Sequence, residues 1–159
     1  YYLIIPRHPE RFSVLEDLLK QKNIPYQKRS DNQQVNNQTK VVIGDSMGEM
    51  YMYYAASDLA FVGGSLVPLG GHNLIEAFAM SRPVLTGPHT FNFSEITEQA
   101  IDAGCAQRAS DAEGVMRSAQ ALIDDTDKRL AMGAQAHAFF LQHQGATDRT
   151  MKAIEKFIR

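Results

Sequence analysis

The amino-acid sequence predicts an α/β fold, a Rossmann-like doubly wound domain with a parallel sheet of about six strands and helices on both faces. Short apolar runs rich in Val, Ile and Leu alternate along the chain with longer segments of helical periodicity. Strands that are apolar on both faces are typical of parallel sheets covered on both sides. The 159 residues suit a single domain, which we expect to span residues 1–159.

The first half of the chain has four predicted strands and two predicted helices. Pro6 ends the first strand, and a helix follows from about Glu10, with Phe12, Leu15, Leu18 and Leu19 on one face. The expected elements are buried strands at 2–5, 41–43 and 59–62, a short strand at 24–28, an exposed Asn- and Gln-rich loop at 30–39, and a second helix at 48–56.

The second half is predicted to be mainly helical around two further strands. Ser110 is a candidate N-cap for the helix that follows the last strand. The expected elements are a helix at 73–80, a strand at 83–86, a helix at 94–103, a weak strand at 105–108, and helices at 112–124, 127–142 and 148–158.

Composition excludes several classes of protein. A net charge of −2 gives no reason to expect a nucleic-acid partner, and no apolar run is long enough to span a membrane. Cys105 is the one cysteine, which rules out an internal disulfide and fits a reducing compartment. The chain begins without Met inside a strand-like segment, so we expect it to be a piece of a longer protein whose active site it holds only in part.

Three strand ends carry the residues that best fit a ligand site. They are residues 6–8, with Pro6 and Arg7, after the first strand, residues 45–49 after the third, and residues 63–65 after the fourth. In a parallel sheet these ends lie on one edge, where ligands of open α/β sheets bind, so one crevice is expected. Arginine suits phosphate or carboxylate, and backbone N–H groups at loop-to-helix junctions suit anions.

Asn73 and Glu76 lie on one face of the first turn of the predicted helix. A carboxylate only accepts hydrogen bonds, so Glu76 suits a vicinal diol such as a ribose. The alternative is that the pair forms a helix capping box. Similar alternatives stand for the third strand end, where Asp45 or Ser46 would cap a helix and Met47 would fill the core.

Other polar residues give weaker signals. Ser65, Gly71 and His72 border the glycine loop, and His72 fits either an anionic ligand or a packing role. The five histidines have no metal-ligand spacing, and neither a dinucleotide fingerprint nor a P-loop occurs, so no metal or cofactor is expected. Packing is the favoured role of the Tyr51 to Tyr54 cluster.

Three motifs together resemble one enzyme family. PRHPERF, the run DSMGEMYMYYAASDLAFVGGS and GGHNLIEAFAMSRPVLTGP are similar to the C-terminal half of bacterial Kdo (3-deoxy-D-manno-octulosonic acid) transferases of lipopolysaccharide biosynthesis. The resemblance implies a GT-B enzyme whose C-terminal domain binds the donor CMP-Kdo, without metal, at the cytoplasmic face of the inner membrane of Gram-negative bacteria. It implies CMP contacts from Pro6, Arg7, Met47, Gly48, Glu49, Asn73, Leu74, Ile75 and Glu76.

The same resemblance implies that the catalytic base is a glutamate of the N-terminal domain, which this chain lacks. The lipid A precursor would bind to that N-terminal domain as well. The chain alone is then expected to bind donor without transferring sugar. Two alternatives remain open at this point. One is the donor domain of a UDP-sugar-dependent GT-B glycosyltransferase or epimerase, and the other is a non-catalytic Rossmann-like binding module.

Overall fold

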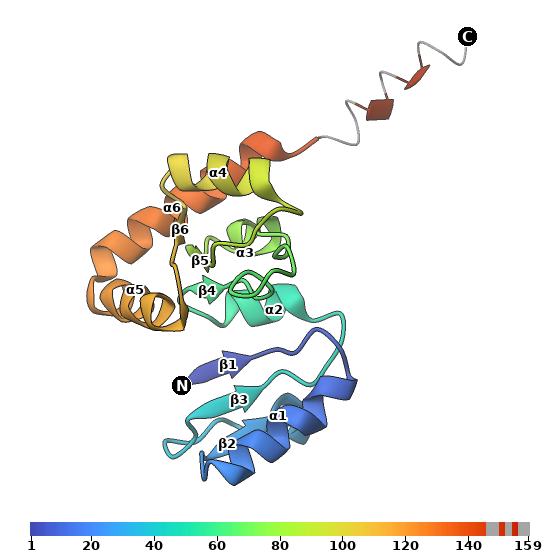
Figure 1. Ribbon diagram of the computed structural model, residues 1–159, viewed down its shortest axis with the longest axis vertical. Coiled ribbons are helices and arrows are strands. Elements are labelled where there is room, and N and C mark those ends of the chain that lie inside the picture. Colours follow the sequence, from blue (N-terminus) through green and yellow to red (C-terminus); the bar gives the residue numbers. More distant parts are fainter. Residues whose placement is uncertain (146–149, 152–153, 156–159) are drawn as a thin grey trace. The chain divides into compact units, whose positions relative to one another are not determined.

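The computed structural model describes residues 1–145, 150–151 and 154–155, and these divide into two compact units, 1–57 and 58 onward. Both units are built from parallel strands and helices, which confirms the predicted α/β class (Figure 1). All six predicted strands are present, but they pair as two three-stranded sheets, one in each unit. The single domain over 1–159 stays a prediction.

The first unit contains three strands, two α-helices and one 3₁₀ helix. Its elements are β1 (Tyr2–Ile4), α1 (Glu10–Gln21), β2 (Tyr26–Lys28), the 3₁₀ helix η1 (Arg29–Asp31), β3 (Val41–Ile43) and α2 (Met50–Ala55). The prediction of loop from residue 30 onward missed η1. The second unit contains β4 (Ala60–Phe61), α3 (Ile75–Ala79), β5 (Val84–Thr86), α4 (Ser94–Asp102), β6 (Ala106–Arg108), α5 (Ala112–Asp124) and α6 (Thr126–His143).

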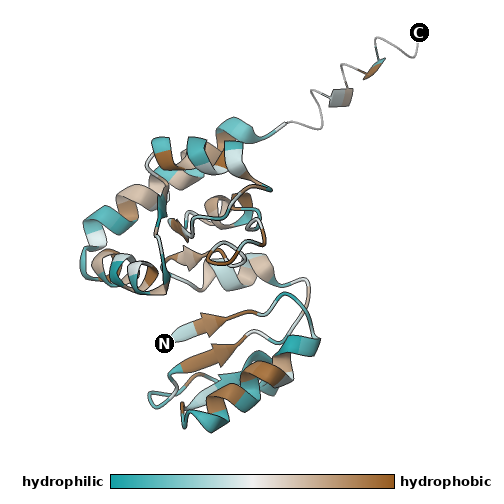
Figure 2. Ribbon diagram, viewed as in Figure 1, coloured by the Kyte–Doolittle hydropathy of each residue, from teal (hydrophilic) through white to brown (hydrophobic). Residues whose placement is uncertain are grey.

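Strand β3 is the centre of the first sheet, which has the order β1-β3-β2. Its three residues are buried on both faces, and Figure 2 shows the strand brown along its length. Leu19 of α1 packs on Val41 and Ile43, joined by Leu15 and Tyr26. By contrast β1 lies at the edge of this sheet, and Tyr2 and Ile4 are 58% and 39% exposed, so the prediction of a buried strand at 2–5 is wrong.

The second unit has its own sheet, in the order β4-β5-β6. Val84 and Leu85 of the central strand β5 are fully buried, and Leu85 packs with residues of α5 and α6. Helix α6 passes close to the end of α3: a Cβ on Gly133 would lie 2.5 Å from the backbone oxygen of Ser81. Glycine at this position therefore permits a helix contact that a larger residue would prevent.

One predicted cap is wrong and one predicted helix falls mainly on residues that are not described. The N-cap of α5 is Asp111, not Ser110, because Asp111 has extended backbone angles and its carboxylate accepts the N–H of Gly114 at 2.7 Å. Ser110 instead donates to Asp111. The helix predicted at 148–158 lies largely outside the described residues.

No helix in the described part of the chain is long and apolar enough to cross a membrane.

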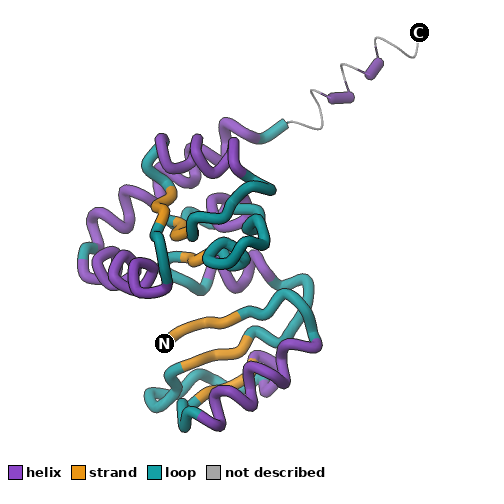
Figure 3. The backbone as a smooth tube through the Cα atoms, in the orientation of Figure 1, coloured by secondary structure: helices purple, strands orange, loops and turns teal. Residues whose placement is uncertain are grey.

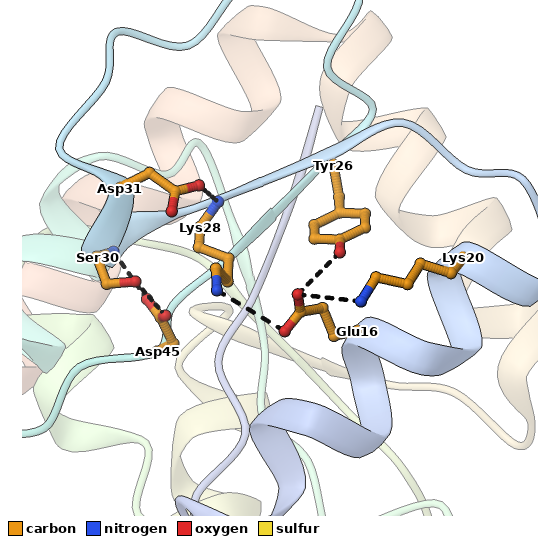
Figure 4. Close-up of polar contacts among 7 residues, drawn as sticks. All are labelled: Glu16, Lys20, Tyr26, Lys28, Ser30, Asp31 and Asp45. Atoms are coloured by element: carbon orange, nitrogen blue, oxygen red, sulfur yellow. Dashed lines mark hydrogen bonds and ion pairs between the residues drawn. The ribbon is translucent and has the colours of Figure 1, made fainter.

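A polar cluster attaches α1 to β2 beside the apolar contacts of Leu19. Glu16 accepts a hydrogen bond from the hydroxyl of Tyr26 at 3.0 Å, and it lies 3.4 Å from the Lys20 ammonium and 3.8 Å from that of Lys28 (Figure 4). The hydrogen bond from Tyr26 has the largest effect on the Glu16 carboxyl and favours its ionised form. Partial burial opposes ionisation, whereas the two lysines favour it. The pKa of Glu16 is therefore lowered.

Stability should depend on this cluster only when Glu16 is ionised. A lowered folded-state pKa stabilises the protein above the unfolded-state pKa of about 4.3, and the contribution disappears as the pH falls through the folded value. We expect Glu16→Gln to lower the urea midpoint near pH 7, and to lower it less at a pH low enough to protonate Glu16 in the folded protein. Asp17→Asn on the same helix is the control. A Glu16→Gln loss of equal size at both pH values would refute this account.

Candidate functional site

The carboxyl edge of the first sheet brings two of the predicted site segments together. The parallel register sets Ile4 of β1 and Lys28 of β2 on either side of Ile43 of β3. The pairing of β1 with β3 extends one residue further, because Gly44 donates its N–H to the oxygen of Ile4 at 2.9 Å. The segment with Pro6 and Arg7 and the segment 44–49 thus leave from neighbouring strands, as the sequence predicted.

The loop 45–49, between β3 and α2, presents its middle residues outward. Met47 is 63% exposed, so its alternative role as core filler is wrong. Gly48 has a φ of +78°, a conformation that side chains disfavour, and a Cβ there would meet nothing within 4 Å. Met47 is therefore exposed, and open space lies where a side chain of residue 48 would be.

The flanks of this loop are fixed by side chains rather than by helix caps. The backbone N–H and the hydroxyl of Ser30 both bond to the Asp45 carboxylate, at 2.9 and 2.5 Å. The Ser46 hydroxyl bonds to the Glu49 carboxylate and to the hydroxyl of Tyr53. The N-cap of α2 is Glu49, whose side chain makes no cap hydrogen bond. The alternative that Asp45 or Ser46 caps α2 is therefore wrong.

The four residues Tyr51 to Tyr54 do not act alike. Tyr53 is 3% exposed and its ring lies against Gly44, where a Cβ would come within 2.9 Å of the ring. Tyr51 is exposed on the surface of α2. Packing is therefore confirmed for Tyr53, which also reaches the loop through Ser46.

In the second unit, the loop between β4 and α3 folds back on itself (Figure 3). The N–H of Gly71 donates to the oxygen of Gly64 at 2.9 Å and closes the loop. Gly64, Gly70 and Gly71 all have positive φ, so the glycines are needed for the shape of the loop itself. The ring of His72 lies against Gly64, whose Cβ would be 3.2 Å from Nε2. This contact fits the packing role considered for His72.

Ser65 is fully buried beneath this loop. Its hydroxyl donates to the oxygen of Val62 at 2.7 Å and accepts the N–H of Gly87 at 2.9 Å. A Cβ on Gly87 would lie 2.3 Å from the backbone oxygen of Ser65, so the loops after β4 and β5 touch backbone to backbone. The hydroxyl of Ser65 thus joins two loops, and a direct ligand contact by Ser65 stays a prediction.

The remaining predicted site residues lie at the start of α3. Asn73 is exposed, and its side-chain oxygen accepts the N–H of Ile75 at 3.0 Å. Leu74 is buried and is the N-cap of α3, where no side chain makes a cap hydrogen bond. Asn73 therefore makes a turn with Ile75 rather than the N-cap contact of a capping box. Glu76 is half-buried in the first turn of α3.

Pro6, Arg7 and 47–49 belong to the first unit, and the residues from Ser65 to Glu76 to the second. Their meeting in one crevice stays a prediction. The described residues hold no cluster of His, Cys, Asp or Glu that could bind a metal ion, and metal independence likewise stays a prediction.

Cys105 is buried and donates to the oxygen of Ala100. Burial raises the pKa of this thiol to about 11, which makes it unreactive.

Two further residues, Arg29 and Ser30, belong to this region and were not predicted from the sequence. They form η1 directly after β2, so they lie at the same carboxyl edge as the segments after β1 and β3. The rule that selected the other strand ends applies equally to this one. The signal was therefore present, but the polar sequence after Lys28 was interpreted as an exposed loop.

Comparison with known proteins assigns the chain to a family. The family model of glycosyl transferases group 1 matches residues 19–139. The chain therefore belongs to the group 1 family of glycosyl transferases. This result, together with the fold, confirms the predicted glycosyltransferase class.

Within this family the chain is similar to Kdo transferases, as its motifs predicted. It is 41% identical over 157 residues to the 3-deoxy-D-manno-octulosonic acid transferase of Haemophilus influenzae and 45% identical over 157 residues to that of Bordetella pertussis. Each alignment covers 98% of this chain and 37% of the relative, so the chain spans little more than a third of their length.

A solved structure is similar over most of the chain. It is the C-terminal CMP-Kdo binding domain of WaaA from Acinetobacter baumannii, with a TM-score of 0.82 and 37% sequence identity. The match covers 86% of this chain and 72% of that one. The predicted resemblance to the donor domain of a GT-B enzyme is thereby confirmed at the level of the fold.

The buried hydroxyl of Ser65 should contribute to the free energy of unfolding. Ser65→Ala leaves the N–H of Gly87 without its partner in a buried place, so unfolding should become easier by about 1–3 kcal/mol. Urea unfolding of the purified protein measures the change. Ser110→Ala, at an exposed site, is the matched control and should change the free energy of unfolding by less than about 0.5 kcal/mol. Equal effects of the two substitutions would contradict the assignment.

Proposed function

We propose that this chain binds CMP-Kdo as the donor domain of a glycosyltransferase that transfers Kdo to a lipid A precursor. The observation that carries the proposal is the 37% identity, at a TM-score of 0.82, to a domain described as CMP-Kdo binding. The loops at the carboxyl ends of the strands supply the groups that a nucleotide needs. The whole enzyme is proposed to work at the cytoplasmic face of the inner membrane.

Each loop is proposed to recognise one part of the donor. The exposed backbone of Met47 and Gly48 would hold the cytosine, whose edge offers both donors and acceptors. Arg7 would bind the phosphate or the cytosine side, since a guanidinium is a fixed fork of donors. The Glu76 carboxylate would accept both ribose hydroxyls.

The catalytic step is proposed to need the part of the enzyme that lies outside this sequence. The base, a glutamate, and the acceptor site would belong to the N-terminal domain. Transfer would proceed without a metal ion, because arginine and backbone dipoles can stabilise the departing phosphate. On this proposal the chain by itself binds donor and CMP and transfers no sugar.

Isothermal titration of the chain with CMP tests the donor assignment. CMP and UMP differ at the base, where CMP carries an exocyclic amine and UMP an oxygen, so a site built for CMP should discriminate by about tenfold or more. Tighter binding of UMP would favour the UDP-sugar alternative. Binding of neither nucleotide would overturn the proposal for this chain.

Glu76→Gln tests the role of the carboxylate, because it keeps the size of the side chain and replaces one acceptor by a donor. We expect CMP affinity to fall by about tenfold, with an unchanged urea midpoint. Affinity for 2′-deoxy-CMP should fall less, since one of the two hydroxyls is already absent. Glu113→Gln, on the exposed surface of α5, is the control. Equal losses for CMP and 2′-deoxy-CMP would reject the ribose contact.

A further inference from the structure

The 3₁₀ helix η1 makes two separate contacts with the loop 45–49. Ser30 donates its N–H and its hydroxyl to the two oxygens of Asp45, at 2.9 and 2.5 Å. Figure 4 shows the two residues facing each other across the end of the sheet. Burial opposes the ionisation of Asp45, but the Ser30 hydrogen bonds and the nearby Lys28 outweigh it and lower the pKa of Asp45. The contact is therefore made by a carboxylate and is charge-assisted.

The second contact joins Arg29 to the far end of the loop. Its Nη2 lies 3.2 Å from Oε1 of Glu49. Its Nη1 donates to the side chain of Asn32 at 2.7 Å, and Asn32 ends η1 with a φ of +51°. One guanidinium thus connects the end of η1 to the loop, and both partners fix its orientation.

The loop is also held from the side of α2. The second oxygen of Glu49 accepts the hydroxyl of Ser46, which is bonded in turn to the buried Tyr53. Contacts from η1 and α2 therefore fix residues 45, 46 and 49, while Met47 and Gly48 between them stay exposed. Both oxygens of Glu49 have protein partners, so its side chain helps to fix the loop, and its CMP contact stays a prediction.

We propose that Arg29 and Ser30 are positioning residues of the nucleotide site, which hold the loop 45–49 so that the backbone of Met47 and Gly48 meets the base. This inference rests on the proposed function. Neither residue touches the nucleotide; each acts through a residue of the loop. A site that exists in only a fraction of the molecules binds with an affinity reduced by that fraction, so loosening the loop lowers affinity without removing any ligand contact.

A double-mutant cycle on the purified chain tests the inference. Arg29→Ala should weaken CMP binding by roughly fivefold, the size of effect that a half-exposed ion pair can have. Glu49→Gln removes the charge from the same contact. The double variant should therefore lose no more CMP affinity than whichever single variant binds CMP more weakly. Lys20→Ala removes an ion pair of the same unit that does not reach the loop, and it should bind CMP like the unaltered chain.

Conservative variants separate positioning from general stability. Ser30→Thr keeps the hydroxyl and should retain CMP affinity, whereas Ser30→Ala should lose it by a few-fold at an unchanged melting temperature. Unchanged affinity in both Arg29→Ala and Ser30→Ala, or losses that add in the double variant, would overturn the inference while the donor assignment stands.

A ligand-free measurement keeps this test apart from that of the donor assignment. The ¹⁵N relaxation of the Gly48 and Glu49 amides reports the order of the loop without any nucleotide. Arg29→Ala should lower the order parameters of these two amides, and Lys20→Ala should not. Unchanged order in Arg29→Ala would overturn the positioning role whether or not the chain binds CMP, whereas an unaltered chain that binds no CMP would overturn the proposed function.

Discussion

The parallel pairing of β3 with both β1 and β2 is the constraint on which the site of the first unit depends. Because all three strands run in one direction, their carboxyl ends open at the same edge, and the three loops that follow them become neighbours. Burial of Val41 to Ile43 on both faces keeps β3 at the centre of this sheet, between β1 and β2. The polar contacts of Arg29 and Ser30 with the next loop are a consequence of this strand pairing.

The glycine-rich segment of the second unit is shaped first by the protein itself. The bond from Gly71 to Gly64 joins two residues with positive φ, and the contact of Gly87 with Ser65 leaves no room for a Cβ. The sequence pattern was interpreted as a loop made for a ligand, and the structure shows that the same glycines also serve packing. These roles are compatible, because a loop fixed by its own contacts presents its backbone to a ligand without first having to be ordered.

The strands, most helices, the parallel arrangement and the grouping at the carboxyl edge could be predicted, because they follow from local periodicity and from the geometry of parallel sheets. The side-chain partners could not. Ser30 and Asp45 are 15 residues apart, and Arg29 and Glu49 are 20 apart, so their contacts exist only once the strand register is known. The cap of α5 failed for a smaller reason: Ser110 and Asp111 are adjacent and both are good caps, and backbone angles decided between them.

Two glutamates of the predicted site look alike in the sequence but differ in their contacts with the rest of the protein. Glu49 and Glu76 both lie at the start of a helix after a glycine-containing loop, and both suit a ligand contact by residue type. The structure gives the Glu49 carboxylate two protein partners, Arg29 and Ser46, while its contact with a ligand stays a prediction. A base read by backbone groups depends on the conformation of the chain and not on one side chain. Selectivity for the base would then come from how firmly the loop is held, and so from residues that never reach the ligand.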